Sequence, residues 1–181
     1  MKRIHSENNF IFFTATLVCV LLVSAIVGST PAGENHRLIQ AVLLLTQLAA
    51  YFSLNLSRHW RGFIALILVL MLASNGVHEL THGTEVPLIT LIICLIFYCG
   101  MAYAAARQVL FSGSINHNTI VGTVAVYLLL GLIWALMYLI TLEYWPGGIN
   151  GIEYRNWHDN LGAEVYYSFI TMTSTGYSDI T

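Results

Sequence analysis

The amino-acid sequence predicts an all-α, multi-span helical membrane protein. Hydrophobic residues make up 57% of the 181 residues and charged residues only 9%, whereas soluble domains carry about 45–50% apolar and about 25% charged residues. Five apolar stretches approach or reach the roughly 20 residues with which a helix crosses a bilayer. These stretches are Phe10–Gly28, Leu38–Leu56, Phe63–Val77, Leu88–Ala106 and Thr119–Ile140.

The first three stretches differ in their flanks and their polar residues. The first follows Lys2 and Arg3, but it exceeds the roughly 7–15 apolar residues of a cleavable signal peptide, so we expect a retained signal anchor. The second contains Gln40 and Gln47, which we expect to form hydrogen bonds between helices. The third is short, and it spans a bilayer only if its helix continues through His78.

Basic residues predict how the helices are oriented, because cytoplasmic loops retain Lys and Arg. A cytoplasmic N-terminus places five basic residues inside and two outside. Those inside are Lys2, Arg3, Arg58, Arg61 and Arg107, and those outside are Arg37 and Arg155. The fifth stretch then leaves the membrane on the outer side. We expect a multi-pass protein of the cell (plasma or cytoplasmic) membrane, with the lipid bilayer as its surroundings.

A loop and a short helix follow the fifth stretch. Residues 142–161 contain a proline, three glycines and several charges, which is typical of an exposed loop. Asp159 or Asn160 can cap a helix there, and Glu164 suits its first turn. Apolar residues then recur at helical spacing, namely Val165, Phe169 and Met172. We expect a helix of about three turns, which is too short to span a membrane.

The short helix leads into the run TSTGYSD. Irregular backbone at membrane depth is tolerated only where protein buries it or where it lines a water-filled cavity. The 15 residues YYSFITMTSTGYSDI resemble the pore helix and selectivity filter of the potassium-channel pore family, whose pattern is an aromatic pair followed by T-x-T-T-V-G-Y-G-D. The preceding helix and loop resemble that family in arrangement only.

The resemblance implies an ion channel in which four identical chains surround one axis. Potassium ions would bind in the filter, and no other cofactor or catalytic residue is implied. Rings of backbone carbonyls replace the water shell of the ion, and glycine permits the backbone conformation that this requires. The filter residues that the resemblance implies are Ser174, Thr175, Gly176, Tyr177 and Ser178.

The same resemblance implies residues that support the filter. Thr173 lies just before the filter strand, and Asp179 lies behind its outer end. Tyr166 and Tyr167 occupy the positions of the aromatic pair, where each hydroxyl can form a hydrogen bond toward the filter or Asp179. The alternative is that both tyrosines belong to an interfacial aromatic belt.

Two departures from the family pattern bear on ion selectivity. Ser178 stands where the family has its second filter glycine, and a non-glycine residue at positive φ costs roughly 1–2 kcal/mol. Ile170 stands where some members have a glutamate. We expect a potassium-selective pore, and the alternative is a pore that passes monovalent cations less selectively.

The family plan divides the chain into two parts. Residues 1–110 are expected to form a four-helix peripheral transmembrane domain, and residues 114–181 a partial pore domain with outer helix, loop, pore helix and filter. A voltage sensor needs repeated arginines on its fourth helix. Residues 87–106 contain no arginine, so we expect weak or absent voltage dependence.

A competing motif, HELTH, covers residues 78–82. It matches H-E-x-x-H, in which two histidines one turn apart bind zinc and a glutamate acts as general base. His78 and His82 are therefore candidate metal ligands of an intramembrane zinc metalloprotease, although a third ligand has no obvious source. The motif is also compatible with an external metal or proton site, and we favour over both a helix end that carries no chemistry.

Remaining features exclude some classes and leave others open. Cys19, Cys94 and Cys99 all lie in apolar stretches, so they predict no disulfide framework and no zinc framework. Seven scattered basic residues predict no nucleic-acid partner. In the family a second pore helix follows the filter, and we expect this chain to be truncated before that helix. The sequence is also compatible with a non-conducting accessory membrane subunit.

Overall fold

The structure, a computed structural model, describes residues 9–28, 36–53, 62–70, 73, 87–113, 115–153 and 155–176. Within these ranges every regular element is an α-helix, and residues 62–70 are helical as well. The prediction of an all-α fold is confirmed. The labelled helices are α1 (Asn9–Gly28), α2 (His36–Ser53), α4 (Pro87–Leu110), α5 (His117–Tyr144) and α6 (Trp157–Met172).

Three of the five predicted spans are long and apolar enough to cross a membrane. They are Phe10–Val27 in α1, Leu88–Leu110 in α4 and His117–Tyr144 in α5. In α2 the apolar segment is shorter, at Leu38–Phe52. The third predicted span is helical over 63–70, and most of its second half lies outside the described residues. A multi-pass membrane protein is the class that these helices support.

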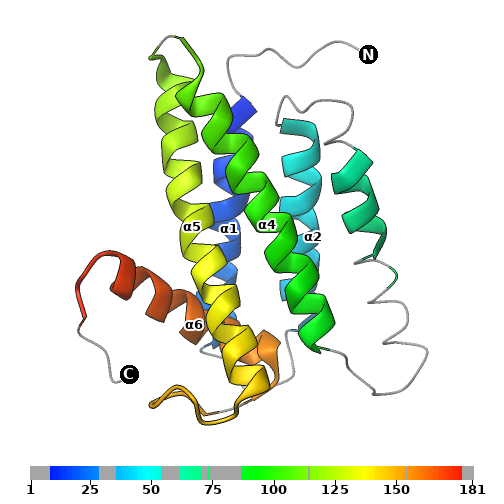
Figure 1. Ribbon diagram of the computed structural model, residues 1–181, viewed down its shortest axis with the longest axis vertical. Coiled ribbons are helices and arrows are strands. Elements are labelled where there is room, and N and C mark those ends of the chain that lie inside the picture. Colours follow the sequence, from blue (N-terminus) through cyan, green and yellow to red (C-terminus); the bar gives the residue numbers. More distant parts are fainter. Residues whose placement is uncertain are drawn as a thin grey trace.

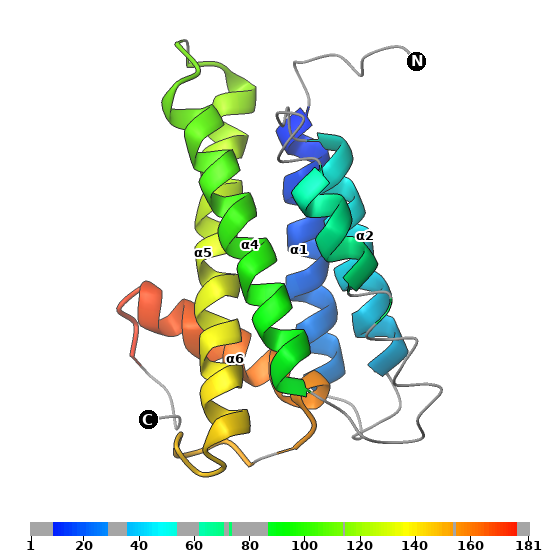
Figure 2. The ribbon, with the colours of Figure 1, turned by 45° about the vertical axis from the view of Figure 1, so that its right-hand side comes forward.

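The long helices form a bundle with the short helix set against it. Helices α1, α2, α4 and α5 run side by side along the long axis of the molecule (Figures 1 and 2). Helix α4 packs on α5, and α1 packs on both α2 and α5. Helix α6 begins at the end of the bundle where α5 ends and slants back beside α5 (Figures 1 and 2), in contact with α1 and α5.

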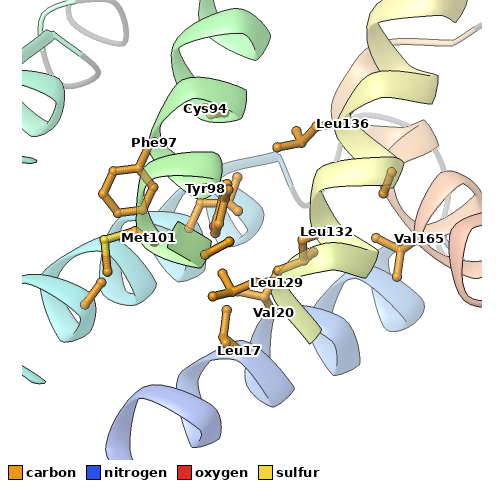
Figure 3. Close-up of a cluster of buried hydrophobic side chains, with 14 of the residues drawn as sticks. Leu17, Val20, Cys94, Phe97, Tyr98, Met101, Leu129, Leu132, Leu136 and Val165 are labelled. Carbon is orange, nitrogen blue, oxygen red and sulfur yellow. The ribbon is translucent and has the colours of Figure 1, made fainter. Parts of the chain in front are cut away.

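The core lies where α1, α4 and α5 meet. Tyr98 of α4 points toward Leu129 of α5 and Val20 of α1 (Figure 3), and all three side chains are buried. Gly122 of α5 lies close to Phe10 of α1, because a Cβ atom at position 122 would stand 3.1 Å from the Phe10 ring. Small residues at such crossings let membrane helices approach closely, and this contact brings α1 against α5.

Local signals fix where α5 begins. The Asn116 side chain caps the helix by accepting a hydrogen bond from the Thr119 backbone N–H at 2.9 Å, as short polar residues do at helix starts. The Asn118 side-chain oxygen accepts a hydrogen bond from the Phe10 backbone N–H at 3.1 Å. The first turn of α5 is therefore tied to the start of α1.

Candidate functional site

Helix α6 carries the candidate site, and its backbone explains where it begins. The Asn156 carbonyl accepts hydrogen bonds from the backbone N–H groups of Asp159 at 2.9 Å and Asn160 at 3.2 Å. The helix therefore starts at Trp157, and the prediction that Asp159 or Asn160 caps it is wrong. Both residues lie inside the helix, and Asp159 in the first turn interacts favourably with the helix dipole.

One face of α6 is buried against the bundle. The helix has 16 residues, which gives a length of about 24 Å, less than the roughly 30 Å of a bilayer core. The prediction of a helix too short to span is confirmed. Its buried residues are Trp157, His158, Asn160, Leu161, Glu164, Val165 and Ser168. They recur at the three- and four-residue spacing of a single helix face.

Helix α6 is seated on α5 at a glycine. The Ser168 hydroxyl donates a hydrogen bond to the Gly131 carbonyl at 2.7 Å, and both groups are buried. A Cβ atom at position 131 would overlap the ring of Phe169. Gly131 is therefore a notch into which Phe169 fits, and this notch sets how closely the two helices approach.

Aromatic rings extend the contact on both sides of the notch. The ring of Tyr167 lies 4.8 Å from that of Tyr138 on α5, and the ring of Phe169 lies 5.9 Å from that of Tyr127. Tyr138 thus packs against α6. Trp134 reaches the contact through Tyr138, with their ring centroids 6.1 Å apart.

Helix α6 ends in a Schellman motif. The Thr175 N–H donates to the Ile170 carbonyl and the Ser174 N–H donates to the Thr171 carbonyl, both at 3.0 Å, which is the pair of bonds that defines this motif. Ser174 takes the left-handed conformation with φ 56°, a position that glycine usually fills. The sequence pattern predicts backbone strain at Ser178, which lies outside the described residues. Among the described residues, the non-glycine residue with positive φ is Ser174.

The four described residues at this end are exposed. They are Thr173, Ser174, Thr175 and Gly176. The Thr173 hydroxyl donates to the Phe169 carbonyl at 2.8 Å and shares a hydrogen bond with the Thr175 hydroxyl at 2.8 Å. Gly176 has φ 64°, a conformation that glycine adopts readily. Exposed hydroxyl residues and a left-handed glycine thus follow the end of α6.

Several predicted site residues cannot be placed with these four. Tyr177, Ser178 and Asp179 of the predicted filter lie outside the described residues, as do His78 and His82 of the HELTH motif. The predicted aromatic pair divides, because Tyr167 packs on Tyr138 while Tyr166 is 53% exposed. The proposed bonds from these tyrosines toward Asp179 stay predictions.

Sequence reasoning missed a line of buried polar residues on α6. Asn160, Glu164 and Ser168 follow one another at intervals of four, so they lie one above another on one helix face. Glu164, predicted to lie in the first turn, lies in the helix interior, and neither of its carboxylate oxygens has a hydrogen-bond partner among the described residues. The four-residue interval of polar side chains was the signal that would have identified this line.

A second polar contact links α6 to α2. The Gln40 side-chain nitrogen lies 3.3 Å from His158 Nε2, and the His158 ring stacks on Trp157 with centroids 3.6 Å apart. The prediction that Gln40 bonds between helices is confirmed. The N-terminal turn of α6 is therefore attached to α2.

Comparisons with known proteins do not assign this chain to a family. No family model, curated protein or solved structure matches it. Among the described residues, no group of three or more His, Cys, Asp or Glu side chains lies close enough to hold a metal ion.

Proposed function

We propose that this chain is the subunit of a tetrameric channel that conducts monovalent cations, with potassium as the preferred ion. Four copies bring residues 174–178 together around one axis as a selectivity filter. Residues 1–110 form the peripheral part of each subunit, and residues 114–181 supply the outer helix, loop, pore helix and filter. The protein lies in the cell membrane with a cytoplasmic N-terminus.

One observation carries this proposal: a helix too short to span is seated on a spanning helix and ends in exposed hydroxyl groups and a left-handed glycine. The seat is the Ser168–Gly131 hydrogen bond. The exposed end is Thr173–Gly176. This is the geometry that a re-entrant pore helix needs, because irregular backbone at membrane depth must be covered by protein or face a water-filled cavity.

Electrostatics at the helix end favour a cation. The aligned peptide dipoles of a helix place about half a negative charge at its C-terminus. Four such ends directed at one axis lower the energy of a cation that has lost its water. The hydroxyl groups of Thr173, Ser174 and Thr175 are exposed, and each adds an oxygen that can bind a cation or hold the filter strand.

The deciding experiment is ion flux into liposomes that contain the complete product of the gene. We expect potassium flux that exceeds sodium flux. Gly176→Ala is expected to reduce potassium flux at least tenfold, because a side chain at positive φ costs roughly 1–2 kcal/mol per chain and each subunit contributes one such position to the filter.

Gly147 supplies a matched control for this substitution. Its φ is +91°, that of Gly176 is +64°, and a Cβ atom at either position meets nothing within 4 Å. Gly147→Ala therefore introduces similar backbone strain without touching the proposed filter, and we expect unchanged flux. An equal loss of flux in both variants would contradict the proposed role of Gly176.

The same measurement distinguishes the competing functions. Equal potassium and sodium flux that depends on Gly176 identifies a less selective cation pore. Absent flux in a protein that is folded and tetrameric identifies a non-conducting accessory subunit. No described residue favours a zinc metalloprotease, since His78 and His82 lie outside the described chain.

A further inference from the structure

Glu164 is a buried acid whose carboxylate pairs with no basic side chain among the described residues. Its side chain is fully buried, and neither carboxylate oxygen has a hydrogen-bond partner among the described residues. An ionised carboxylate in such surroundings is costly, so the group neutralises by binding a proton. A neutral carboxylic acid is the form that this packing accepts.

The place of Glu164 makes its protonation state matter for α6. One turn earlier, Leu161 lines a small apolar crevice together with Val20 and Ser24 of α1. One turn later, Ser168 binds the Gly131 carbonyl of α5. Glu164 therefore lies at the junction through which α6 is held to both α1 and α5.

Among the described residues, no lysine or arginine pairs with the Glu164 carboxylate. Residues 9–28 of α1 include no Asp, Glu, Lys, Arg or His. Tyr138 of α5 interacts electrostatically with Glu164, and this phenol is neutral or negative. On α6 itself the titratable side chains are His158, Asp159, Tyr166 and Tyr167. From α2, the neutral Gln40 side chain lies 3.3 Å from His158 of α6.

We propose that Glu164 is a proton-binding site that couples pH to the seating of α6 on α1 and α5. The inference rests on the proposed function only in that α6 is the pore helix. A bound proton keeps Glu164 neutral and α6 seated. Release of the proton places a carboxylate at the junction, which favours an arrangement in which α6 lifts and the carboxylate reaches water.

The direction of the pH effect follows from the burial of Glu164. Burial raises the pKa of Glu164 from 4.5 to about 7. In an arrangement with α6 lifted, the carboxyl group returns to its ordinary pKa. The free energy of the lifted arrangement, relative to that of the seated one, therefore falls as pH rises from 4.5 to about 7. Above that range the difference in free energy stays constant. Acid favours the seated helix.

Hydrogen–deuterium exchange of the full chain in lipid nanodiscs tests this without any measurement of conduction. After correction for intrinsic exchange, we expect protection of the α6 amides to fall between about pH 5 and pH 8. The fall is up to about a hundredfold, since each unit of pKa shift corresponds to a factor of ten. In Glu164→Gln, which mimics the protonated acid, we expect high protection at both pH values.

Glu153→Gln is the matched control, because the Glu153 side chain is 85% exposed and pairs with Arg155. It should keep the pH dependence of the wild type. Infrared difference spectra of the wild type provide a second measurement that needs no variant. A carbonyl band of a protonated carboxylic acid, present in acid and lost near pH 7, supports the proposal. Absence of that band, or pH dependence that survives in Glu164→Gln, overturns it whether or not the protein conducts ions.

Discussion

Gly131 is the single residue on which the position of the candidate site depends most. It offers its carbonyl to Ser168 and leaves room for the ring of Phe169. Membrane helices gain little from the hydrophobic effect within lipid, so close packing and hydrogen bonds must hold them together. Both kinds of contact meet at this one position.

Gly131→Ala is expected to destabilise the protein. The added methyl group overlaps the Phe169 ring, and overpacking of this kind costs about 1–3 kcal/mol. The measurement is the free energy of unfolding in detergent micelles. Adding Phe169→Leu, which shortens the opposing side chain, should recover part of the loss.

Gly62→Ala is the control for this prediction. A Cβ atom at position 62 meets nothing within 4 Å, and alanine is favoured over glycine in a helix by about 1 kcal/mol, so we expect unchanged or slightly increased stability. If Gly131→Ala is as stable as Gly62→Ala, Phe169 turns aside easily and Gly131 is not a rigid notch.

The C-terminal end of α6 places a serine in a backbone conformation that serine does not favour. Ser174 adopts φ 56° and closes the Schellman motif with Thr175. For residues other than glycine, this left-handed conformation costs roughly 1–2 kcal/mol. The strained residue is also the first residue of the proposed filter. Position 174 therefore has to end the helix and begin the filter strand, and the helix end requires positive φ there.

Ser174→Gly is expected to stabilise the end of α6 by about 0.5–1 kcal/mol. Relief of roughly 1–2 kcal/mol of strain exceeds the roughly 0.5–1 kcal/mol of entropy that glycine loses on folding. Amide exchange at residues 171–176 measures the effect. Thr175→Gly, at a position without positive φ, should have the opposite sign. Slower exchange in both variants would mean that φ at position 174 is not the cause.

The helices were predictable from sequence, whereas the contacts between them were not. Apolar runs of sufficient length identified α1, α4 and α5, because length and composition alone decide whether a helix can cross a bilayer. The start of α6 was placed too late, because its first hydrogen bonds use the Asn156 carbonyl and composition does not report backbone bonds. The contact of α6 with Gly131 depends on which helices pack together, and hydrophobic periodicity does not predict that pairing.

The candidate site was predictable in part for the same reason. Spacing placed Phe169 on a helix, as the structure has it. The residues from Thr173 to Gly176 follow that helix and are exposed, and their role in a filter stays a prediction. Glu164 was assigned to a first turn, where an acid is ordinary. Its burial follows from the packing of α6 on two other helices, so its proton chemistry emerges only from the tertiary structure.

The two ends of α5 can be used to assign the two sides of the membrane. The helix has 28 residues, about 42 Å in length, so it is long enough for its ends to lie on opposite sides of a hydrocarbon core of about 30 Å. Its first end carries the short turn from α4, and its second end leads into the loop before α6 (Figure 1). The side of the membrane on which the loop before α6 lies follows from the orientation of α5.

Cysteine labelling tests that orientation with one residue at each end. Ile115 is 88% exposed and Asn150 is exposed as well, so Ile115→Cys and Asn150→Cys are accessible in a background without the three native cysteines. Since basic residues favour the cytoplasm, a membrane-impermeant maleimide should label Asn150→Cys in intact cells. It should label Ile115→Cys only after the membrane is opened. The reverse pattern would place the N-terminus outside and the proposed filter entrance in the cytoplasm, and labelling of both from one side would show that α5 does not span.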